Sequence, residues 1–263
     1  MLCLWQSSNT IVLPFNDIEA VKETFSSHAN QIAAVIVEPV AGNMGCIPPA
    51  PGYLETLREI TEQEGSLLIF DEVMTGFRVA RGGVQELLGI TPDLTALGKI
   101  VGAGLPVGVY GGKAEIMNNI SPDGPVYQAG TLSGNPIAVS AGTALLKQLG
   151  DKEIYTSMEQ NAKSFLSPIK EYADELKIPF SFNVRGGMFG FFFSNSLPKN
   201  FDDVQKTDIE LFAKFFRKML EKNIYLPPSA YESCFISTLH DEDKMTKAAK
   251  LAKESLKEIK DEI

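Results

Sequence analysis

Apolar residues form two short, continuous runs near the start of the chain. Residues 31–38 read Gln-Ile-Ala-Ala-Val-Ile-Val-Glu, and residues 67–70 read Leu-Leu-Ile-Phe. Runs of this length that are rich in branched side chains are typical of strands buried on both faces. Between them, residues 52–64 repeat apolar side chains at helical spacing before Gly65. The order strand, helix, strand predicts a βαβ unit.

The rest of the pattern predicts further elements, and its character changes after Pro179. We expect strands over residues 93–97, 106–110, 180–184, 188–193, 224–226 and 234–237. We expect helices over residues 134–149, 151–177, 203–222 and 242–262. This order indicates an α/β domain with a mostly parallel sheet in residues 1–150. A connecting helix and a smaller α+β domain would occupy residues 151–263.

The composition narrows the classes of function. The chain has 24 Lys and Arg against 33 Asp and Glu, which gives a formal net charge of −9. This acidic surplus argues against nucleic acid and anionic membranes as partners. The cysteines, Cys3, Cys46 and Cys234, are widely spaced, and only two histidines are present. We therefore expect no disulfide framework and no zinc site, and a reducing cytoplasm is the natural location.

Lys99 is the one charged residue in the glycine-rich segment 97–112. A lysine in apolar surroundings loses hydration, so its pKa falls and its neutral amine can form a Schiff base with an aldehyde. The alternative is a lysine that extends into solvent from the end of a buried strand. The segment by itself leaves both interpretations open.

Asp71 follows directly after the apolar run 67–70. Ligands of open α/β sheets bind beyond the carboxyl ends of the strands, and an acidic side chain there can pair with a protonated ring nitrogen. A helix N-cap or a salt bridge would use the same residue type. Glu72 next door has to point to the opposite side of the strand, and we interpret it as structural.

The segment Gly130-Thr-Leu-Ser-Gly-Asn-Pro136 precedes an expected helix. Backbone N–H groups and hydroxyls at the start of a helix can bind an anion such as phosphate. The alternative is N-capping of the helix by Ser133 or Thr131.

Five segments between residues 36 and 137 together carry a resemblance to a known family. They are Glu38-Pro-Val-Ala-Gly-Asn43, Phe70-Asp-Glu-Val-Met-Thr-Gly-Phe-Arg78, Leu97-Gly-Lys99, Gly104-Leu-Pro-Val-Gly108 and Gln128-Ala-Gly-Thr-Leu-Ser-Gly-Asn-Pro136. This set resembles the class-III aminotransferases, whose large domain has the fold of fold-type-I pyridoxal-phosphate enzymes. Variants such as Asn43-Met-Gly-Cys46 resemble the glutamate-1-semialdehyde aminomutase branch in particular.

The resemblance implies pyridoxal 5'-phosphate as the cofactor and assigns roles around its ring. Lys99 would bind the cofactor covalently and move protons. Asp71 would pair with the pyridine nitrogen, and Val73 would pack under the ring. Asn43 would lie near the ring hydroxyl.

The resemblance also implies a homodimer with a contact across its interface, and a substrate contact. Gly130 and Thr131 would bind the phosphate of the cofactor held by the other subunit. Glu232 matches an acidic residue that the family places near the substrate. The cysteines and histidines have no implied chemistry.

The implied reaction is an intramolecular amino transfer that converts glutamate 1-semialdehyde to 5-aminolevulinate for tetrapyrrole synthesis. Two alternatives stay open: a two-substrate ω-aminotransferase and an inactive fragment without catalysis. Chains of the family carry a long segment before the position of Ile11, which holds the other half of the site. We therefore expect an incomplete large domain, a truncated chain and no activity of this chain alone.

Overall fold

The structure is a computed structural model that describes residues 9–262. Its first sheet has the order β1-β2-β3-β4. The strands are β1 (Ala34–Val37), β2 (Leu67–Asp71), β3 (Leu94–Leu97) and β4 (Val109–Gly112). β1, β2 and β3 are parallel, whereas β4 runs antiparallel to β3. The predicted βαβ unit and mostly parallel sheet are confirmed, and the fourth strand begins three residues later than expected.

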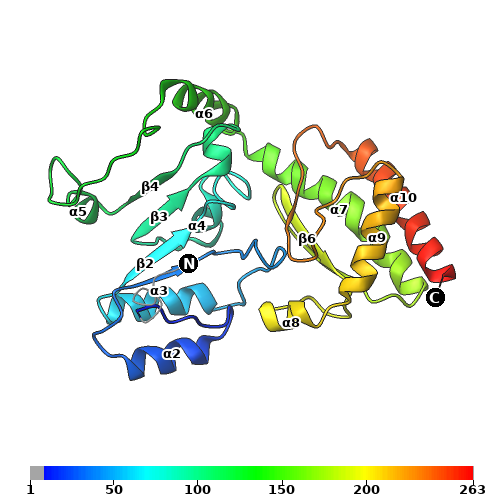
Figure 1. Ribbon diagram of the computed structural model, residues 1–263, viewed down its shortest axis with the longest axis horizontal. Helices are drawn as coiled ribbons and strands as arrows, with labels where there is room; N and C mark the ends of the chain where they lie inside the picture. The colour runs from blue at the N-terminus through cyan, green and yellow to red at the C-terminus, as the bar shows by residue number, and fades with distance from the viewer. Residues whose placement is uncertain (1–8, 263) are drawn as a thin grey trace.

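This part of the structure also contains short helices. They are α2 (Ile18–Ser27), α3 (Tyr53–Gln63), α4 (Gly83–Leu88), α5 (Ala114–Met117), α6 (Pro136–Gln148) and the 3-10 helix η1 (Lys99–Gly102). α3 packs against β2, where Leu68 and Phe70 are fully buried. Figure 1 shows α2 and α3 together on one side of the sheet.

The opposite face of the sheet is open, which corrects one prediction. Ile36 on β1 is 66% exposed, so this strand is not buried on both faces. Ile36 lies opposite Ile69, and Asp71 is two residues further along the same face of β2. The physical reason is that no helix within residues 9–262 covers Ile36. Asp71 therefore lies at the carboxyl edge of the open face.

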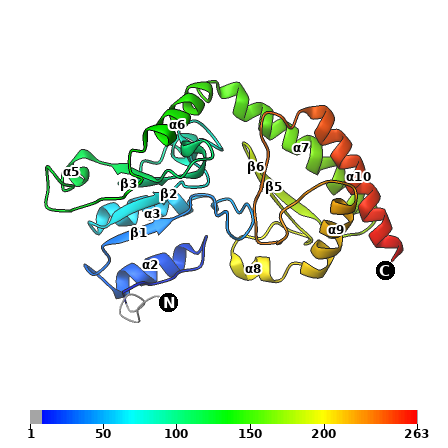
Figure 2. The ribbon, with the colours of Figure 1, turned by 45° about the horizontal axis from the view of Figure 1, so that its top comes forward.

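Helix α7 (Lys152–Glu175) leads from α6 to the second part of the structure, as Figure 2 shows. There a second sheet has the order β5-β6-β7, and all its strands are antiparallel. These strands are β5 (Ser181–Arg185), β6 (Met188–Phe192) and β7 (Cys234–Phe235). The helices that follow β6 are α8 (Phe201–Gln205), α9 (Ile209–Glu221) and α10 (Glu242–Asp261).

Two predictions in this part are wrong. The expected helix 203–222 is divided, because α8 ends at Gln205 and Asp208 caps the start of α9 by accepting a hydrogen bond from Leu211 N at 2.8 Å. Residues 224–226 form no strand, since their backbone pairs with no neighbouring strand in the described structure.

Packing of phenylalanine rings holds the second sheet against its helices. Phe191 lies 5.6 Å from Phe180 and 5.8 Å from Phe215, between ring centroids. A separate hydrophobic cluster lies under the first sheet. Met188 belongs to this cluster under the first sheet, although its strand, β6, is part of the second sheet. The two sheets are therefore connected by packing as well as by α7.

Candidate functional site

The carboxyl ends of the three parallel strands place the predicted residues along one edge. Glu38 follows β1, Asp71 ends β2, and Lys99 lies two residues beyond β3. Asp71 is paired in register with Ala96. Adjacent parallel strands end at the same edge of a sheet, so the fold brings Asp71 and Lys99 to neighbouring strand ends.

Lys99 begins the 3-10 helix η1 with a left-handed backbone, at φ 49°. Such a φ is uncommon for a residue other than glycine, and strained residues concentrate at functional sites. The side chain is exposed, so the apolar surroundings expected from the sequence are absent around it. This correction has the same cause as the exposure of Ile36, namely the open face of the sheet. Exposure alone fits a lysine that extends into solvent. What makes Lys99 a candidate functional residue is its left-handed backbone and its position beside Asp71.

Asp71 is half-buried, and its Oδ1 accepts a hydrogen bond from Val73 N at 3.0 Å. It makes no ion pair among residues 9–262, and a turn rather than a helix follows it. The structure thus supports neither the N-cap nor the salt bridge. Its second carboxylate oxygen has no protein partner in the described part of the chain.

Glu72 points to the opposite side and is fully buried. Its carboxylate accepts hydrogen bonds from Thr75 Oγ1 at 2.8 Å and from Val84 N at 2.9 Å. Gln85 donates to the same carboxylate from its backbone and its side chain. The structural role predicted for Glu72 is confirmed, since these bonds fix the turn between β2 and α4.

Asn43 lies in a turn after β1 that is held by Glu38. The carboxylate of Glu38 accepts hydrogen bonds from Gly42 N at 2.8 Å and from Asn43 Nδ2 at 2.9 Å. A Cβ at Gly42 would lie 2.0 Å from Met74 Sδ, so any other residue there would have to displace the Met74 side chain. This contact joins the Asn43 turn to the segment that follows Asp71.

Glu232 is brought to the same turn by its two neighbours. Gly45 N donates to Tyr231 O at 2.8 Å, and Ser233 Oγ donates to Gly42 O at 2.9 Å. The side chain of Glu232 is exposed between these two anchors. Sequence reasoning missed Ser233, because its partner lies 191 residues away along the chain. It missed the role of Glu38 as well, although both ends of that contact lie within one quoted segment.

Gly130 and Thr131 are exposed in the segment that leads into α6. Asn135 caps this helix through bonds from Ile137 N at 3.1 Å and Ala138 N at 3.2 Å. The alternative in which Ser133 or Thr131 is the cap is therefore wrong. No hydrogen bond within the described residues links Gly130 or Thr131 to the strand edge, so the structure does not join them to Lys99, Asp71 and Asn43.

A cavity in the first part of the structure does not coincide with this edge. It has a volume of about 460 Å³ and is lined by Glu72, Phe77, Arg81 and Gln85 among others. Because Glu72 and Asp71 point to opposite sides of β2, the cavity lies on the covered side of the sheet. The candidate site is thus an open edge rather than a closed pocket in this chain.

The two described cysteines are buried and free. Burial raises the pKa of Cys46 to about 12, although Asn183 donates a hydrogen bond toward its sulfur and Arg185 lies nearby. Burial also raises the pKa of Cys234. Neither thiol would ionise near neutral pH, so neither is a candidate nucleophile. Cys3 lies outside the described residues.

Residues 9–262 lack two further features. No group of His, Cys, Asp and Glu side chains there could hold a metal ion. No helix there has the length and apolar character needed to cross a membrane.

Comparison with known proteins adds a family and several relatives. The aminotransferase class-III family matches residues 6–244. The chain is 51% identical, over 253 residues, to glutamate-1-semialdehyde 2,1-aminomutase 2 of Bacillus licheniformis, covering 96% of this chain and 58% of that protein. It is 48% identical to glutamate-1-semialdehyde 2,1-aminomutase of Aquifex aeolicus, over 95% of this chain and 59% of that protein. The chain thus spans less than two thirds of the length of the curated relatives it matches.

Solved structures show the same fold. A transaminase with PLP bound superposes with a TM-score of 0.84 at 29% identity, over 97% of this chain and 59% of the other. A glutamate-1-semialdehyde aminomutase from Pseudomonas aeruginosa in complex with PMP also gives a TM-score of 0.84, at 24% identity. That match covers 95% of this chain and 56% of the other.

Proposed function

We propose, from the premise that this chain belongs to the class-III aminotransferase family, that it is part of a pyridoxal-phosphate-dependent glutamate-1-semialdehyde 2,1-aminomutase. The observation that carries the proposal is the identity of 51% to such an enzyme across 96% of the chain. The position of Lys99 beside Asp71 at one strand edge supports it. The reaction would convert glutamate 1-semialdehyde to 5-aminolevulinate.

The side chains at the strand edge fit this cofactor chemically. An amine, a carboxylate and an amide are the groups that an aldehyde, a basic ring nitrogen and a ring hydroxyl would require. Lys99, Asp71 and Asn43 supply them, and Val73 follows Asp71 closely enough to pack under a ring. When bound, pyridoxal phosphate supplies an electron-withdrawing ring that stabilises negative charge on the carbon beside the substrate nitrogen.

Each residue then has a definable task. Lys99 Nζ would hold the aldehyde carbon of the cofactor and later carry protons between the reacting carbons. Asp71 would keep the ring nitrogen protonated. Since Val73 N–H occupies Asp71 Oδ1, the second oxygen is the one left for the ring N–H. This charge-assisted contact would be stronger than a neutral one.

Two further roles extend the proposal beyond the strand edge. Thr131 and Gly130 would bind the phosphate of the cofactor in the other subunit of a homodimer. Their exposure, and the capping of α6 by Asn135 in place of Thr131, support this role. Glu232 would contact the substrate near Asn43, which its two anchors support. We also propose that residues 1–150 and 151–263 form the two domains.

The test combines covalent labelling with turnover. The chain matches 58% of the Bacillus licheniformis relative, so two proteins are studied. One is the chain alone, and the other, the joined protein, is the chain joined to the part of that relative which it does not match. After addition of pyridoxal phosphate and reduction with borohydride, peptide mass mapping should locate the label on Lys99. Lys99→Ala should lose it, whereas Lys147→Ala, at an exposed position on α6, should keep it.

Product analysis separates the aminomutase from the ω-aminotransferase. An aminomutase forms 5-aminolevulinate from glutamate 1-semialdehyde without an added amino acceptor. A requirement for an external keto acid would favour the two-substrate alternative. Labelling of Lys99→Ala at another lysine, to the level of the unaltered protein, would remove Lys99 from its proposed role.

A further inference from the structure

The side-chain amide of Asn43 has a chemically fixed orientation. Its Nδ2 lies 2.9 Å from Glu38 Oε1, and the other carboxylate oxygen accepts from Gly42 N at 2.8 Å. Glu38 forms no ion pair with a lysine or arginine anywhere in residues 9–262. Its protein partners are therefore the two N–H groups of the Asn43 turn.

An ionised carboxylate accepts hydrogen bonds and donates none. The oxygen and nitrogen of an asparagine amide look alike in shape, so their assignment normally depends on the surrounding hydrogen bonds. Here Glu38 permits one choice, because Asn43 has to turn its NH₂ group toward the carboxylate. The second N–H of Asn43 and its Oδ1 remain for a ligand, since the side chain is exposed.

The backbone beneath Asn43 is held from several sides. Gly42 N is bonded to Glu38, while Gly42 O accepts from the buried hydroxyl of Ser233 at 2.9 Å. Met74 packs directly against Gly42, where an added Cβ would lie 2.0 Å from its Sδ. Because the backbone N–H and the carbonyl oxygen of Gly42 are both hydrogen-bonded, the loop cannot easily move to take the Asn43 amide away from Glu38.

We propose that Glu38 is a positioning residue that sets which end of the Asn43 amide meets the ring hydroxyl of the cofactor. This inference rests on the proposed function, in which Asn43 lies near that hydroxyl. Glu38 acts through Asn43 and has no contact with the cofactor itself. The orientation gives the hydroxyl one N–H and one carbonyl oxygen at fixed positions.

Glu38→Gln tests orientation because glutamine has one accepting oxygen and one donating NH₂ group. If Gly42 N keeps the oxygen, the NH₂ of the new side chain faces Asn43 and forces its amide to turn around. Adding Asn43→Asp removes the need for that turn, because either carboxylate oxygen accepts from the new NH₂ group, and it fixes donor and acceptor in exchanged positions. Glu64→Gln at the exposed end of α3 is the matched control.

The first readout needs no cofactor. Hydrogen exchange of the Asn43 side-chain NH₂ and of Gly42 N–H is followed by NMR in the chain itself. We expect slow exchange of both in the unaltered chain and in Glu64→Gln. Glu38→Gln should accelerate the Asn43 exchange, because the amide turns its NH₂ group away from residue 38, while Gly42 N–H should stay protected in this variant and in the double variant. Equal Asn43 exchange in Glu38→Gln and the unaltered chain would overturn the proposed contact.

The second readout is the visible absorbance of added pyridoxal phosphate in the joined protein, titrated against concentration and pH. Loss of the hydrogen bond from the Asn43 N–H to the ring hydroxyl predicts about tenfold weaker binding in Glu38→Gln and a shifted pH profile of the band. The double variant should keep this defect, because its loop is restored but its polarity is reversed. Recovery of normal binding in the double variant would show that loop order alone matters, and would refute the orientation role.

Failure of the proposed function gives a different pattern. In that case the joined protein would show no labelling at Lys99, while protection of the Asn43 NH₂ group would still support the pairing with Glu38. Normal labelling with unprotected Asn43 would instead leave the proposed function in place and remove the role of Glu38.

Discussion

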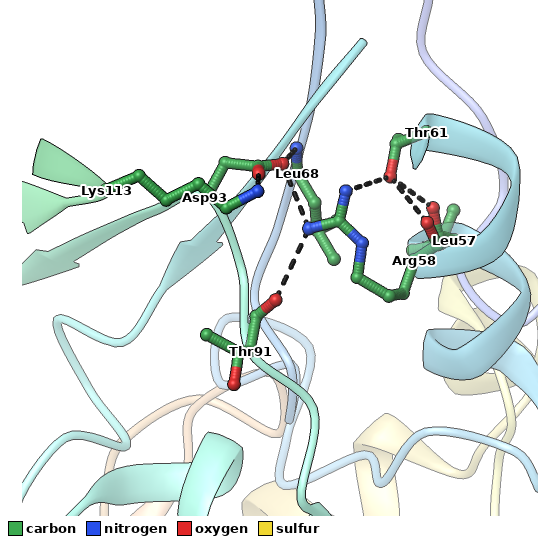
Figure 3. Close-up of polar contacts among 7 residues, drawn as sticks. All are labelled: Leu57, Arg58, Thr61, Leu68, Thr91, Asp93 and Lys113. Carbon is green, nitrogen blue, oxygen red and sulfur yellow. Dashed lines mark hydrogen bonds and ion pairs between the residues drawn. The ribbon is translucent and has the colours of Figure 1, made fainter. Parts of the chain in front are cut away.

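Asp93→Asn removes a negative charge from a nearly solvent-free position at the amino end of β3. The Asp93 side chain is 4% exposed. Its Oδ2 accepts from Leu68 N at 2.7 Å and lies 3.0 Å from Arg58 Nη1, while its Oδ1 lies 2.6 Å from Lys113 Nζ. Figure 3 shows these groups converging from α3, β2 and the end of β4. The network thus holds together the strands whose opposite ends carry the candidate site.

The expected loss of folding free energy in each variant depends on how exposed the partners of Asp93 are. Removing one partner of a buried ion pair costs roughly 3–5 kcal/mol. Arg58 is 20% exposed and keeps bonds to Thr61 Oγ1 and Thr91 O, so we expect about 2–4 kcal/mol for Asp93→Asn. Lys113 is 49% exposed, and a pair of that kind contributes roughly 0–1 kcal/mol. Lys113→Met should therefore cost far less than Asp93→Asn.

The pH dependence has a definite sign. Burial alone would raise the pKa of Asp93, but hydrogen bonds from Leu68 N–H, Lys113 and Arg58 outweigh it and hold the pKa below its usual value. A carboxyl whose pKa is lowered on folding stabilises the protein above its unfolded pKa, which is about 3.9 for Asp. That stabilisation is lost as pH falls through the lower, folded pKa. The difference between the unaltered chain and Asp93→Asn should thus shrink below about pH 4.

The assay is urea unfolding followed by far-UV circular dichroism at neutral and acidic pH. Exchange of Leu68 N–H is measured alongside, because it reports the first sheet specifically. The expected order of destabilisation is Asp93→Asn well above Lys113→Met at neutral pH, with a smaller gap in acid. Equal costs for the two variants, or a gap that widens as pH falls, would refute this reasoning.

Three other outcomes are expected. Asp71→Asn in the cofactor-loaded joined protein should keep the covalent label but reduce turnover about tenfold or more, since a charge-assisted bond contributes roughly 1.5–3 kcal/mol. Near-normal turnover of this variant would exclude Asp71 as the partner of the ring nitrogen. Gly142→Ala would place a methyl group 2.2 Å from Val101 O, so urea unfolding should show net destabilisation despite the better helix propensity of alanine. Ser233→Ala removes the bond to Gly42 O and should cost about 1 kcal/mol while weakening substrate binding more than cofactor binding; unchanged substrate binding would contradict a role for this anchor.

Local pattern was enough to predict the core of the first sheet. The apolar run 67–70 and the helical spacing of 52–64 are properties of neighbouring residues, so they predicted β2 and α3 directly. Short motifs likewise singled out Asp71 and Lys99, and the structure places both at neighbouring strand ends. Their chemical roles stay predictions.

The errors arose where distant residues decide the outcome. The periodicity of 203–222 continues through Asp208, yet the chain breaks between α8 and α9 there, where Asp208 N donates to the distant Phe193 O at 3.1 Å. The run 31–38 has the composition of a strand covered on both sides, yet exposure of Ile36 depends on what packs above β1. Exposure of Lys99 has the same origin. None of these features is encoded by the spacing of residues within one segment.

The sequence by itself determined most element types, because these follow from local periodicity. It also determined which motifs follow the parallel strands and the family to which the chain belongs, because these follow from short motifs. The tertiary structure decided that Ser233 anchors Glu232 beside Asn43, and that Glu38 orients the Asn43 amide. It also decided the left-handed backbone of Lys99. The physical reason is that the hydrogen bond between Ser233 and Gly42 joins residues 191 positions apart in the sequence, and no local pattern specifies such a contact.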